Sequence, residues 1–384
     1  MIMSVYKEDI IEAKERLAAW WDHEIIDRPC ISYFLPKSDV PFKGVYDFWY
    51  LAKNWEDIKG YLDDFEEKSE SINFKHENIP WLFPNYGPGI MASIFGVEPV
   101  FKSETVWFNH PVPVDEIVSF LENVKLDSNN EWYNRLLNIT EYAAKRAENN
   151  YSVAVTDLGG VLDILSSFLG PTNIILTMKR NPSLIDSCRS IILEKLLQVY
   201  EDLQCIIEKY QDGCNSWLPV WCPKRWYPIQ CDFSAMLSPK YFKRFVLPDI
   251  REQAESMDYA IYHLDGPGQL IHLDDLLEEP SITGIQWVPG SGNEAAQSDK
   301  WFPIYKKIQE MGKNIVVDNP LDATKDVTRL YKKFDPKGLF MILVYFTEIK
   351  ALYYLPDFLG GNYGEGDYRD FKREYRKKKK NINK

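Results

Sequence analysis

Short apolar runs alternate with longer amphipathic segments along most of this chain, and this alternation constrains the fold more than any other feature. It predicts parallel strands joined by right-handed helical crossovers. The predicted strands span residues 30–34, 79–83, 152–158, 216–221, 259–264, 282–288, 314–317 and 339–346. The predicted helices span residues 4–21, 45–70, 115–147, 182–210, 239–257, 300–311 and 323–334.

Eight such strand–helix units predict an α/β fold, a single closed (β/α)8 TIM-type barrel with an N-terminal helical extension. A doubly wound open sheet is the alternative, and it is disfavoured because no G-x-G-x-x-G turn follows the early strands. We expect the extension to cover residues 1–27 and the barrel to cover residues 28–370. Residues 371–384 are expected to form a basic, disordered tail.

The composition narrows the class of partner. The net charge is −12, and the basic tail leaves the rest of the chain more acidic still, which argues against nucleic acid as a partner. The sequence shows no apolar signal segment, no run of about 18 apolar residues, and no cysteine spacing typical of a zinc ribbon or a redox dithiol. We therefore expect a cytoplasmic protein without membrane contact that acts on a small molecule. The surplus of aromatic residues is compatible with a homodimer.

One predicted strand closes with the sequence Tyr262-His263-Leu264-Asp265-Gly266. Residues two apart on a strand point to the same face, so His263 and Asp265 are expected to project together from its carboxyl end. In a (β/α)8 barrel the active site lies at that end of the strands. A histidine beside a carboxylate can bind a metal, transfer a proton or hold a polar substrate.

The other predicted strand ends bring carboxylates and aromatic rings to the same edge. Asp157 is expected to act with His263 and Asp265 as a catalytic residue. If His263 and Asp265 bind zinc, Glu348, which follows the last predicted strand, is the expected third ligand. The substrate-binding residues expected at these ends are Tyr86, Trp221, Trp287, Asp318 and Tyr345.

Four stretches carry a family resemblance: Phe168-Leu169-Gly170-Pro171-Thr172, Asp232-Phe233-Ser234, Leu237-Ser238-Pro239-Lys240-Tyr241-Phe242 and His263-Leu264-Asp265-Gly266. In this order and spacing, the chain resembles the uroporphyrinogen decarboxylase (URO-D) superfamily over roughly residues 28–365. The resemblance implies a (β/α)8 barrel. Further stretches look like a divergent subgroup without known activity, and they add Trp107, Gln230 and Asp232 to the expected substrate-binding residues.

The resemblance implies two activity classes. The decarboxylases bind a tetrapyrrole of many carboxylates through an Arg-Gln-Ala-Gly-Arg-Tyr pattern, which the sequence after Arg28 lacks. The corrinoid-linked methyltransferases hold zinc with a His-x-Cys pair and a later cysteine, whereas here the pair is His263 and Asp265 and no cysteine follows Cys231. Zinc held by His263, Asp265 and Glu348 would polarise the atom that bears the methyl group, and a corrinoid on a separate partner protein would accept that group.

Three functions remain open on the sequence. The leading hypothesis is methyl transfer from a small O- or N-methylated compound to a corrinoid protein. The second is a decarboxylase, a lyase or another acid–base enzyme that uses Asp157, Asp232 and Asp265. The third is a barrel that binds a small molecule without catalysis.

Overall fold

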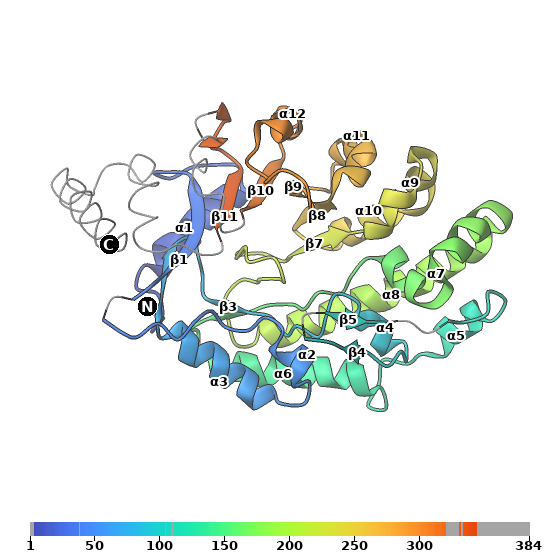
Figure 1. Cartoon of the computed structure of the whole chain (residues 1–384), viewed down its shortest axis with the longest axis horizontal. Coiled ribbons are helices and arrows are strands. Elements are labelled where there is room, and N and C mark those ends of the chain that lie inside the picture. The colour runs from blue at the N-terminus through green and yellow to red at the C-terminus, as the bar shows by residue number, and fades with distance from the viewer. Residues whose placement is uncertain are drawn as a thin grey trace, which may run out of the picture.

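The protein is described by a computed structural model that covers residues 4–37, 39–103, 105–108, 111–319, 330–331 and 333–343. A seven-stranded sheet in the order β2–β1–β11–β10–β9–β8–β7 forms its centre (Figure 1). Neighbouring strands in this sheet are parallel, except that β2 is antiparallel to β1. The strands are β1 (Cys30–Pro36), β2 (Ile72–His76), β3 (Trp81–Leu82), β4 (Val100–Phe101), β5 (Val106–Trp107), β6 (Ser152–Val153), β7 (Trp226–Gln230), β8 (Tyr259–Asp265), β9 (Gly284–Val288), β10 (Asn314–Asn319) and β11 (Leu339–Leu343).

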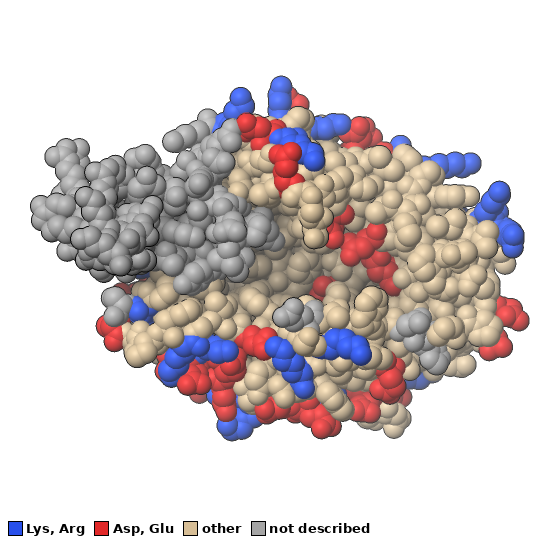
Figure 2. Space-filling model, in the orientation of Figure 1, with Lys and Arg blue, Asp and Glu red and all other residues tan. Residues whose placement is uncertain are grey.

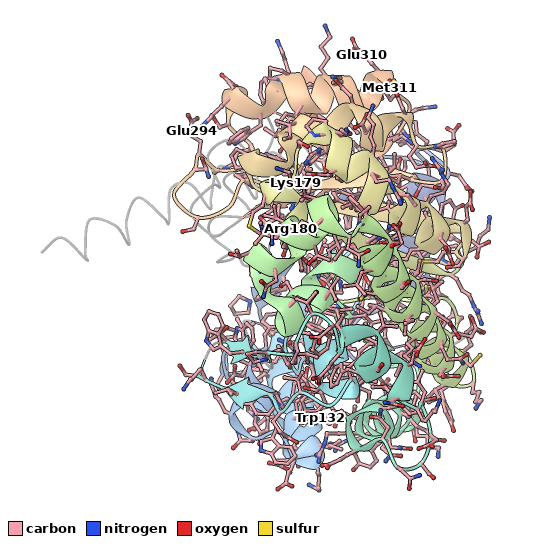
Figure 3. All side chains as sticks on the ribbon, turned by 90° about the vertical axis from the view of Figure 1, so that its right-hand side faces the viewer. Trp132, Lys179, Arg180, Glu294, Glu310 and Met311 are labelled. Carbon is pink, nitrogen blue, oxygen red and sulfur yellow. The ribbon has the colours of Figure 1, made fainter. Side chains whose placement is uncertain are left out.

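Helices surround the sheet and connect its parallel strands. Among them, α10 packs on β7 and α12 packs on β10, as helical crossovers do. Seen from the side, Glu310 and Met311 at the end of α12 lie near one end of the molecule and Trp132 of α6 lies near the other (Figure 3). The helices are α1 (Ile10–Trp21), α2 (Tyr50–Lys53), α3 (Ile58–Ser69), α4 (Ile90–Ile94), α5 (Ile117–Asn123), α6 (Glu131–Ala147), α7 (Val161–Arg180), α8 (Pro182–Ile207), α9 (Pro239–Phe245), α10 (Leu247–Glu255), α11 (Leu273–Glu278) and α12 (Phe302–Glu310), with 3-10 turns η1 (Asp232–Met236), η2 (Pro267–His272) and η3 (Asp299–Trp301).

The described strands do not join into the closed barrel that the sequence predicts. The sheet ends at β7 and β2, while β3 and β6 pair separately and β4 and β5 form a small ribbon. The predicted strand at residues 216–221 contributes a single bridge, between Ser216 and Val155. There the chain folds back on itself, because Cys214 and Cys222 exchange two main-chain hydrogen bonds. Among the described strands, no ladder links β7 to β6.

The strand order nevertheless differs from that of a doubly wound sheet. Strands β7 to β11 follow one another in chain order, and β1 comes next to β11. A doubly wound sheet reverses its order near the middle, and this sheet does not. The predicted strands at 30–34, 259–264, 282–288 and 314–317 are confirmed by β1, β8, β9 and β10. Strands β2 and β7 were not predicted.

The register of the sheet creates one polar row. Gln230 of β7 pairs with His263 of β8, and His263 pairs with Gln286 of β9. Paired residues of parallel strands share a face, so these three side chains lie side by side on one face of the sheet. The opposite face is apolar: Trp287 is fully buried there and packs edge-on against Trp301, with ring centroids 4.9 Å apart. The polar row is therefore turned away from the covering helices.

A second apolar cluster lies where α1 meets the central strands. Trp20 and Trp21 of α1 are buried in it, together with Trp226, Ile261 and Phe340. The Trp21 indole also donates a hydrogen bond of 2.9 Å to the main-chain oxygen of Trp221. The N-terminal helix is thus part of the packed core.

Helix α7 is, by length and composition, apolar enough to cross a membrane, although its apolar residues do not form an unbroken run. Half of its apolar window is buried, and it packs against α8 and α4. These are the properties of a core helix in a globular domain. The cytoplasmic location stays a prediction.

Candidate functional site

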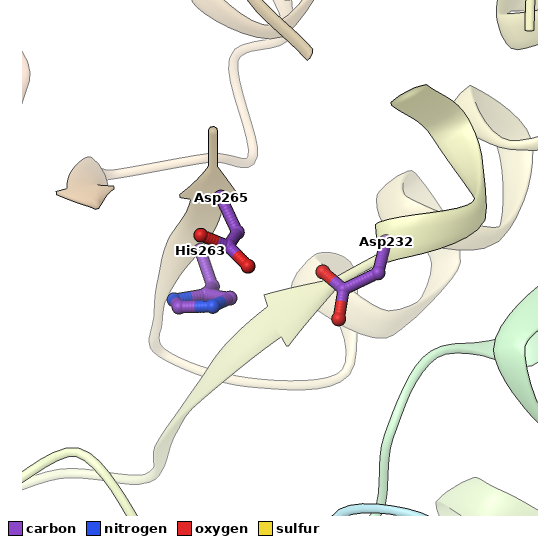
Figure 4. Close-up of side chains that lie close together, drawn as sticks. All are labelled: Asp232, His263 and Asp265. Atoms are coloured by element: carbon purple, nitrogen blue, oxygen red, sulfur yellow. The ribbon is translucent and has the colours of Figure 1, made fainter. Parts of the chain in front are cut away.

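Three side chains of metal-ligand type meet at the carboxyl end of the parallel strands. His263 and Asp265 belong to β8, and Asp232 begins η1 directly after β7. One donor atom from each lies within 4.8 Å of the others. Figure 4 shows the two carboxylates pointing toward each other beside the imidazole. His263 and Asp265 are half-buried and Asp232 is exposed, so the group is accessible from solvent.

The imidazole of His263 is oriented by two neighbours. Its Nδ1 lies 2.7 Å from Oε1 of Gln286, which is only 1% exposed. Because an amide oxygen can only accept a hydrogen bond, Nδ1 carries the hydrogen in this arrangement and Nε2 keeps its lone pair. Trp217 packs edge-on against the ring with centroids 5.1 Å apart. Nε2 is therefore the nitrogen of His263 that can take a ligand.

Asp232 is positioned by a carboxylate that the sequence did not single out. Asp163, in the first turn of α7, accepts hydrogen bonds from the main-chain N–H groups of Asp232 (3.0 Å) and Phe233 (2.7 Å). This contact fixes the turn between β7 and η1. Asp232 is exposed as a residue, but its carboxyl group is largely shielded from water, and this desolvation raises its pKa. His263 opposes the rise, and Asp265 strengthens it.

Asp157 follows β6 and reaches the same region. Its Oδ1 accepts hydrogen bonds from the Gly159 N–H (2.9 Å) and from Nε2 of Gln230 (3.2 Å). Burial raises the pKa of Asp157 to about 7; the Gly159 N–H opposes this rise, and the charges of Asp232 and Asp163 add to it. Burial likewise raises the pKa of Asp163, as does the nearby Asp232. A carboxyl group whose pKa is near 7 can both donate and accept a proton at neutral pH.

Close packing explains the Gly159-Gly160 sequence before α7. Gly159 has φ +72°, a conformation that favours glycine. A Cβ atom on Gly160 would lie 2.3 Å from Oδ2 of Asp163 and 2.4 Å from the main-chain oxygen of Gln230. Only glycine leaves room for the carboxylate of α7 to approach the end of β7.

The structure brings together five of the residues predicted from the sequence. They are the proposed catalytic residues Asp157, His263 and Asp265 and the proposed substrate-binding residues Gln230 and Asp232. Their contacts with one another do not test their roles, which stay predictions. Figure 2 shows acidic side chains gathered in the hollow between the two halves of the molecule.

Other predicted residues lie in different surroundings. Tyr86 is fully buried, and its hydroxyl donates to the main-chain oxygen of Trp55. Trp221 is buried in the cluster around α1, and Trp287 faces the covering helices. Trp107 is 63% exposed on the β4–β5 ribbon. Packing accounts for the first three positions without a ligand.

The structure does not describe the side chains of three predicted site residues. Asp318 belongs to β10, but only its main chain is described. Tyr345 and Glu348 lie outside the described residues. The predicted zinc ligand Glu348 therefore stays a prediction, while Asp232 stands next to His263 and Asp265.

Sequence reasoning missed Asp163 and Gln286. Asp163 lies in a helix, about 70 residues before the main-chain groups that it binds. Gln286 carries a signal that was available, because it is a polar residue inside the apolar run of a predicted strand. A buried amide in such a run needs a hydrogen-bonding partner, and His263 is the partner here.

Comparison with known proteins adds information on the fold. No protein-family model matches the chain, and no curated protein matches its sequence. A solved structure of a methyltransferase from Methanosarcina mazei matches with a TM-score of 0.58 and 12% sequence identity, over 86% of this chain and 92% of that chain. The likeness shows a shared fold. At this identity the resemblance to the URO-D superfamily stays a prediction.

Proposed function

We propose that this protein is a methyltransferase that binds a divalent metal ion, most readily zinc, through Asp232, His263 and Asp265. One observation carries the proposal: these three side chains hold ligand atoms within 4.8 Å of one another at the carboxyl end of a parallel sheet. The shared fold with a methyltransferase agrees with it. In this proposal Asp232 is the third ligand, and the ligand role of Glu348 stays a prediction.

The residues fit such a metal. One imidazole nitrogen and two carboxylates are ligands that zinc accepts, and three protein ligands leave a position open for a substrate atom. Two carboxylates beside a neutral imidazole carry a charge that a divalent cation balances. Gln286 holds the hydrogen on Nδ1 of His263, as the outer partners of metal-binding histidines do.

The proposed donor is a small compound with a methyl group on oxygen or nitrogen. A bound divalent ion would act as a Lewis acid on that oxygen or nitrogen. Asp163 keeps Asp232 in place through the turn before η1, and Trp217 limits the movement of the His263 ring. We propose a corrinoid on a separate protein as the methyl acceptor, which follows the resemblance described above.

We also infer that the sheet is an incompletely closed (β/α)8 barrel. The order of β7 to β11, followed by β1, supports this, because consecutive parallel strands of a barrel are neighbours. The short β3–β6 pair and the bridge from Val155 to Ser216 then stand where the remaining wall would be. In such a fold the metal group lies at the mouth.

Metal analysis of the purified protein is the first test. We expect about one zinc per chain, lost in His263→Ala and strongly reduced in Asp265→Asn. Asp258→Asn is a matched control, because Asp258 is exposed next to the opposite end of β8 and accepts a hydrogen bond from the Arg225 N–H. Metal that survives both His263→Ala and Asp265→Asn would contradict the proposed site.

A donor panel tests the reaction itself. Metal-loaded protein is incubated with a reduced corrinoid carrier and methoxylated or methylated amine compounds, and methylation of the corrinoid is followed by its absorbance. We expect turnover with at least one donor and none with the His263→Ala variant. A fully metal-loaded protein that methylates no corrinoid across the panel would refute methyl transfer.

A second candidate, a decarboxylase or lyase, is favoured by Asp157. Its pKa of about 7 suits a general acid or base, and this role needs no metal. Treatment with a chelator separates the two functions. Activity that survives metal removal and disappears in Asp157→Asn supports the acid–base enzyme, whereas activity that returns only with added zinc supports the methyltransferase.

A further inference from the structure

Buried carboxylates elsewhere in this chain have arginine partners. Asp249 lies 2.6 and 2.8 Å from the guanidinium nitrogens of Arg189, and Glu77 receives two hydrogen bonds of 2.8 Å from Arg28. Such pairing is the usual way for a protein to offset the cost of burying a charge. These two pairs provide a reference for the carboxylates of the candidate site.

The carboxylates of the site lack such partners within the described part of the chain. The main charges that act on Asp157 are the carboxylates of Asp163 and Asp232, and those that act on Asp232 are His263 and Asp265. A divalent metal ion on Asp232, His263 and Asp265 would balance two negative charges. Asp157 and Asp163 would then remain without a cation.

Hydrogen bonds distinguish these two remaining carboxylates. Asp163 uses both oxygens, one for the Asp232 N–H and one for the Phe233 N–H. Asp157 uses only Oδ1, which accepts from Gly159 and Gln230, and its Oδ2 has no hydrogen bond among the described residues. Asp157 is therefore the carboxylate with an oxygen available for a ligand.

Gln230 offers a second acceptor at the same place. The side chain is 7% exposed, and its Nε2 is held by Asp157 at 3.2 Å. Its Oε1 has no hydrogen bond in the part of the chain that the structure describes. Gln230 pairs in register with His263, so this oxygen belongs to the same polar row as the metal group. This oxygen keeps some contact with solvent, so a ligand that donates a hydrogen bond can reach it.

We propose that Asp157 and Gln230 form a subsite for a protonated amine of the substrate, next to the metal group. An ammonium group would supply the missing positive charge to Asp157 and donate N–H groups to Oδ2 of Asp157 and Oε1 of Gln230. This rests on the proposed function for the identity of the substrate as a methyl donor, and it narrows the donor to small compounds that carry an amine. A neutral ether or alcohol would leave the Asp157 charge unbalanced.

Binding of head-group probes tests this subsite without any turnover. tert-Butylammonium chloride and tert-butyl alcohol have almost the same shape, and only the first is charged. Their affinities for the zinc-loaded protein are measured by ligand-observed NMR or calorimetry at pH 8. We expect the ammonium to bind at least about tenfold more tightly, because hydrogen bonds to charged groups are the stronger ones.

Two variants locate the effect. Asp157→Asn keeps an acceptor oxygen for Gly159 and Gln230 and removes the charge, so it should abolish the preference for the ammonium while zinc content stays unchanged. Asp202→Asn is the matched control, since Asp202 lies on helix α8, accepts a hydrogen bond from the hydroxyl of Tyr133 on α6, and has no hydrogen bond to a residue of the site. It should retain the preference.

The outcomes are distinct. Equal binding of the alcohol and the ammonium, or ammonium binding that Asp157→Asn leaves intact, overturns the subsite. Ammonium binding that depends on Asp157 in a protein that binds no zinc supports the subsite and refutes the proposed metal-dependent function instead.

Discussion

Replacing Asp157 by asparagine should change how the stability of the protein depends on pH. Burial raises the pKa of Asp157 from its ordinary 3.8 to about 7, so the folded protein holds a proton that the unfolded chain releases. Between these two values unfolding releases a proton, and the free energy of unfolding falls as pH rises. The carboxyl group thus costs stability above its folded pKa and costs nothing below pH 3.8.

The size of the effect follows from linkage. The slope is about 1.4 kcal/mol per pH unit for one proton and halves as the pH reaches the folded pKa, so Asp157 should remove about 2 kcal/mol of stability between pH 5 and pH 7. Asp157→Asn abolishes that contribution and keeps the acceptor oxygen for Gly159 and Gln230. The variant should therefore gain stability relative to the wild type as pH rises, by up to about 3 kcal/mol between pH 5 and pH 8. This figure is an upper limit, because partial exposure of the side chain weakens the effect.

Urea denaturation at pH 5, 6, 7 and 8 measures this difference directly. The wild type, Asp157→Asn and the control Asp202→Asn are unfolded in parallel, and the free energies are obtained by linear extrapolation. The control should keep the wild-type slope. If Asp157→Asn also keeps it, Asp157 is ionised over the whole range and the reasoning from burial is wrong.

Two of three further predictions concern the surroundings of the site, and the third concerns the Arg189–Asp249 pair elsewhere in the chain. Gln286→Leu should lower zinc affinity about 10- to 100-fold, as loss of an outer partner of a metal-binding histidine does; an unchanged affinity in a competitive zinc titration contradicts the role given to that amide. Gly160→Ala should destabilise the protein by about 1–3 kcal/mol through overpacking, whereas Gly268→Ala, whose new Cβ would meet its nearest atom at 3.2 Å, should change the urea midpoint less. Arg189→Met leaves Asp249 buried and unpaired and should cost about 3–5 kcal/mol at pH 7; a thermal midpoint equal to that of the wild type would show that the pair is not needed.

Periodicity located the strands that carry the site better than it located the whole sheet. Strand β8 was predicted because its apolar residues form a continuous run, which is typical of a strand buried on both faces. Strand β7 was missed because Pro228 lies in its centre, and proline normally argues against a central strand. The antiparallel strand β2 was missed because only Ile72 and Phe74 of its five residues are apolar.

The candidate site was predictable where it depends on one strand, and less so where it depends on register. His263 and Asp265 lie on one face because they are two residues apart. Trp287 was assigned to the face of His263, and this assignment is wrong. Gln286 pairs with His263 and occupies that face, so the next residue, Trp287, points to the opposite face. Asp163 could not be predicted, because its place beside Asp232 depends on the packing of α7 against η1.

Helix α1 has a consequence for how the chain must be made. Trp20 and Trp21 leave the ribosome early, yet their partners include Trp226 and Phe340. At the usual rates of synthesis, about 320 residues separate Trp20 from Phe340 and take roughly 15–60 s to emerge. During that interval the two indoles have no finished surface to pack on. Helix α1 can therefore reach its native packing only after β11 has been synthesised, although it precedes that strand by more than 300 residues.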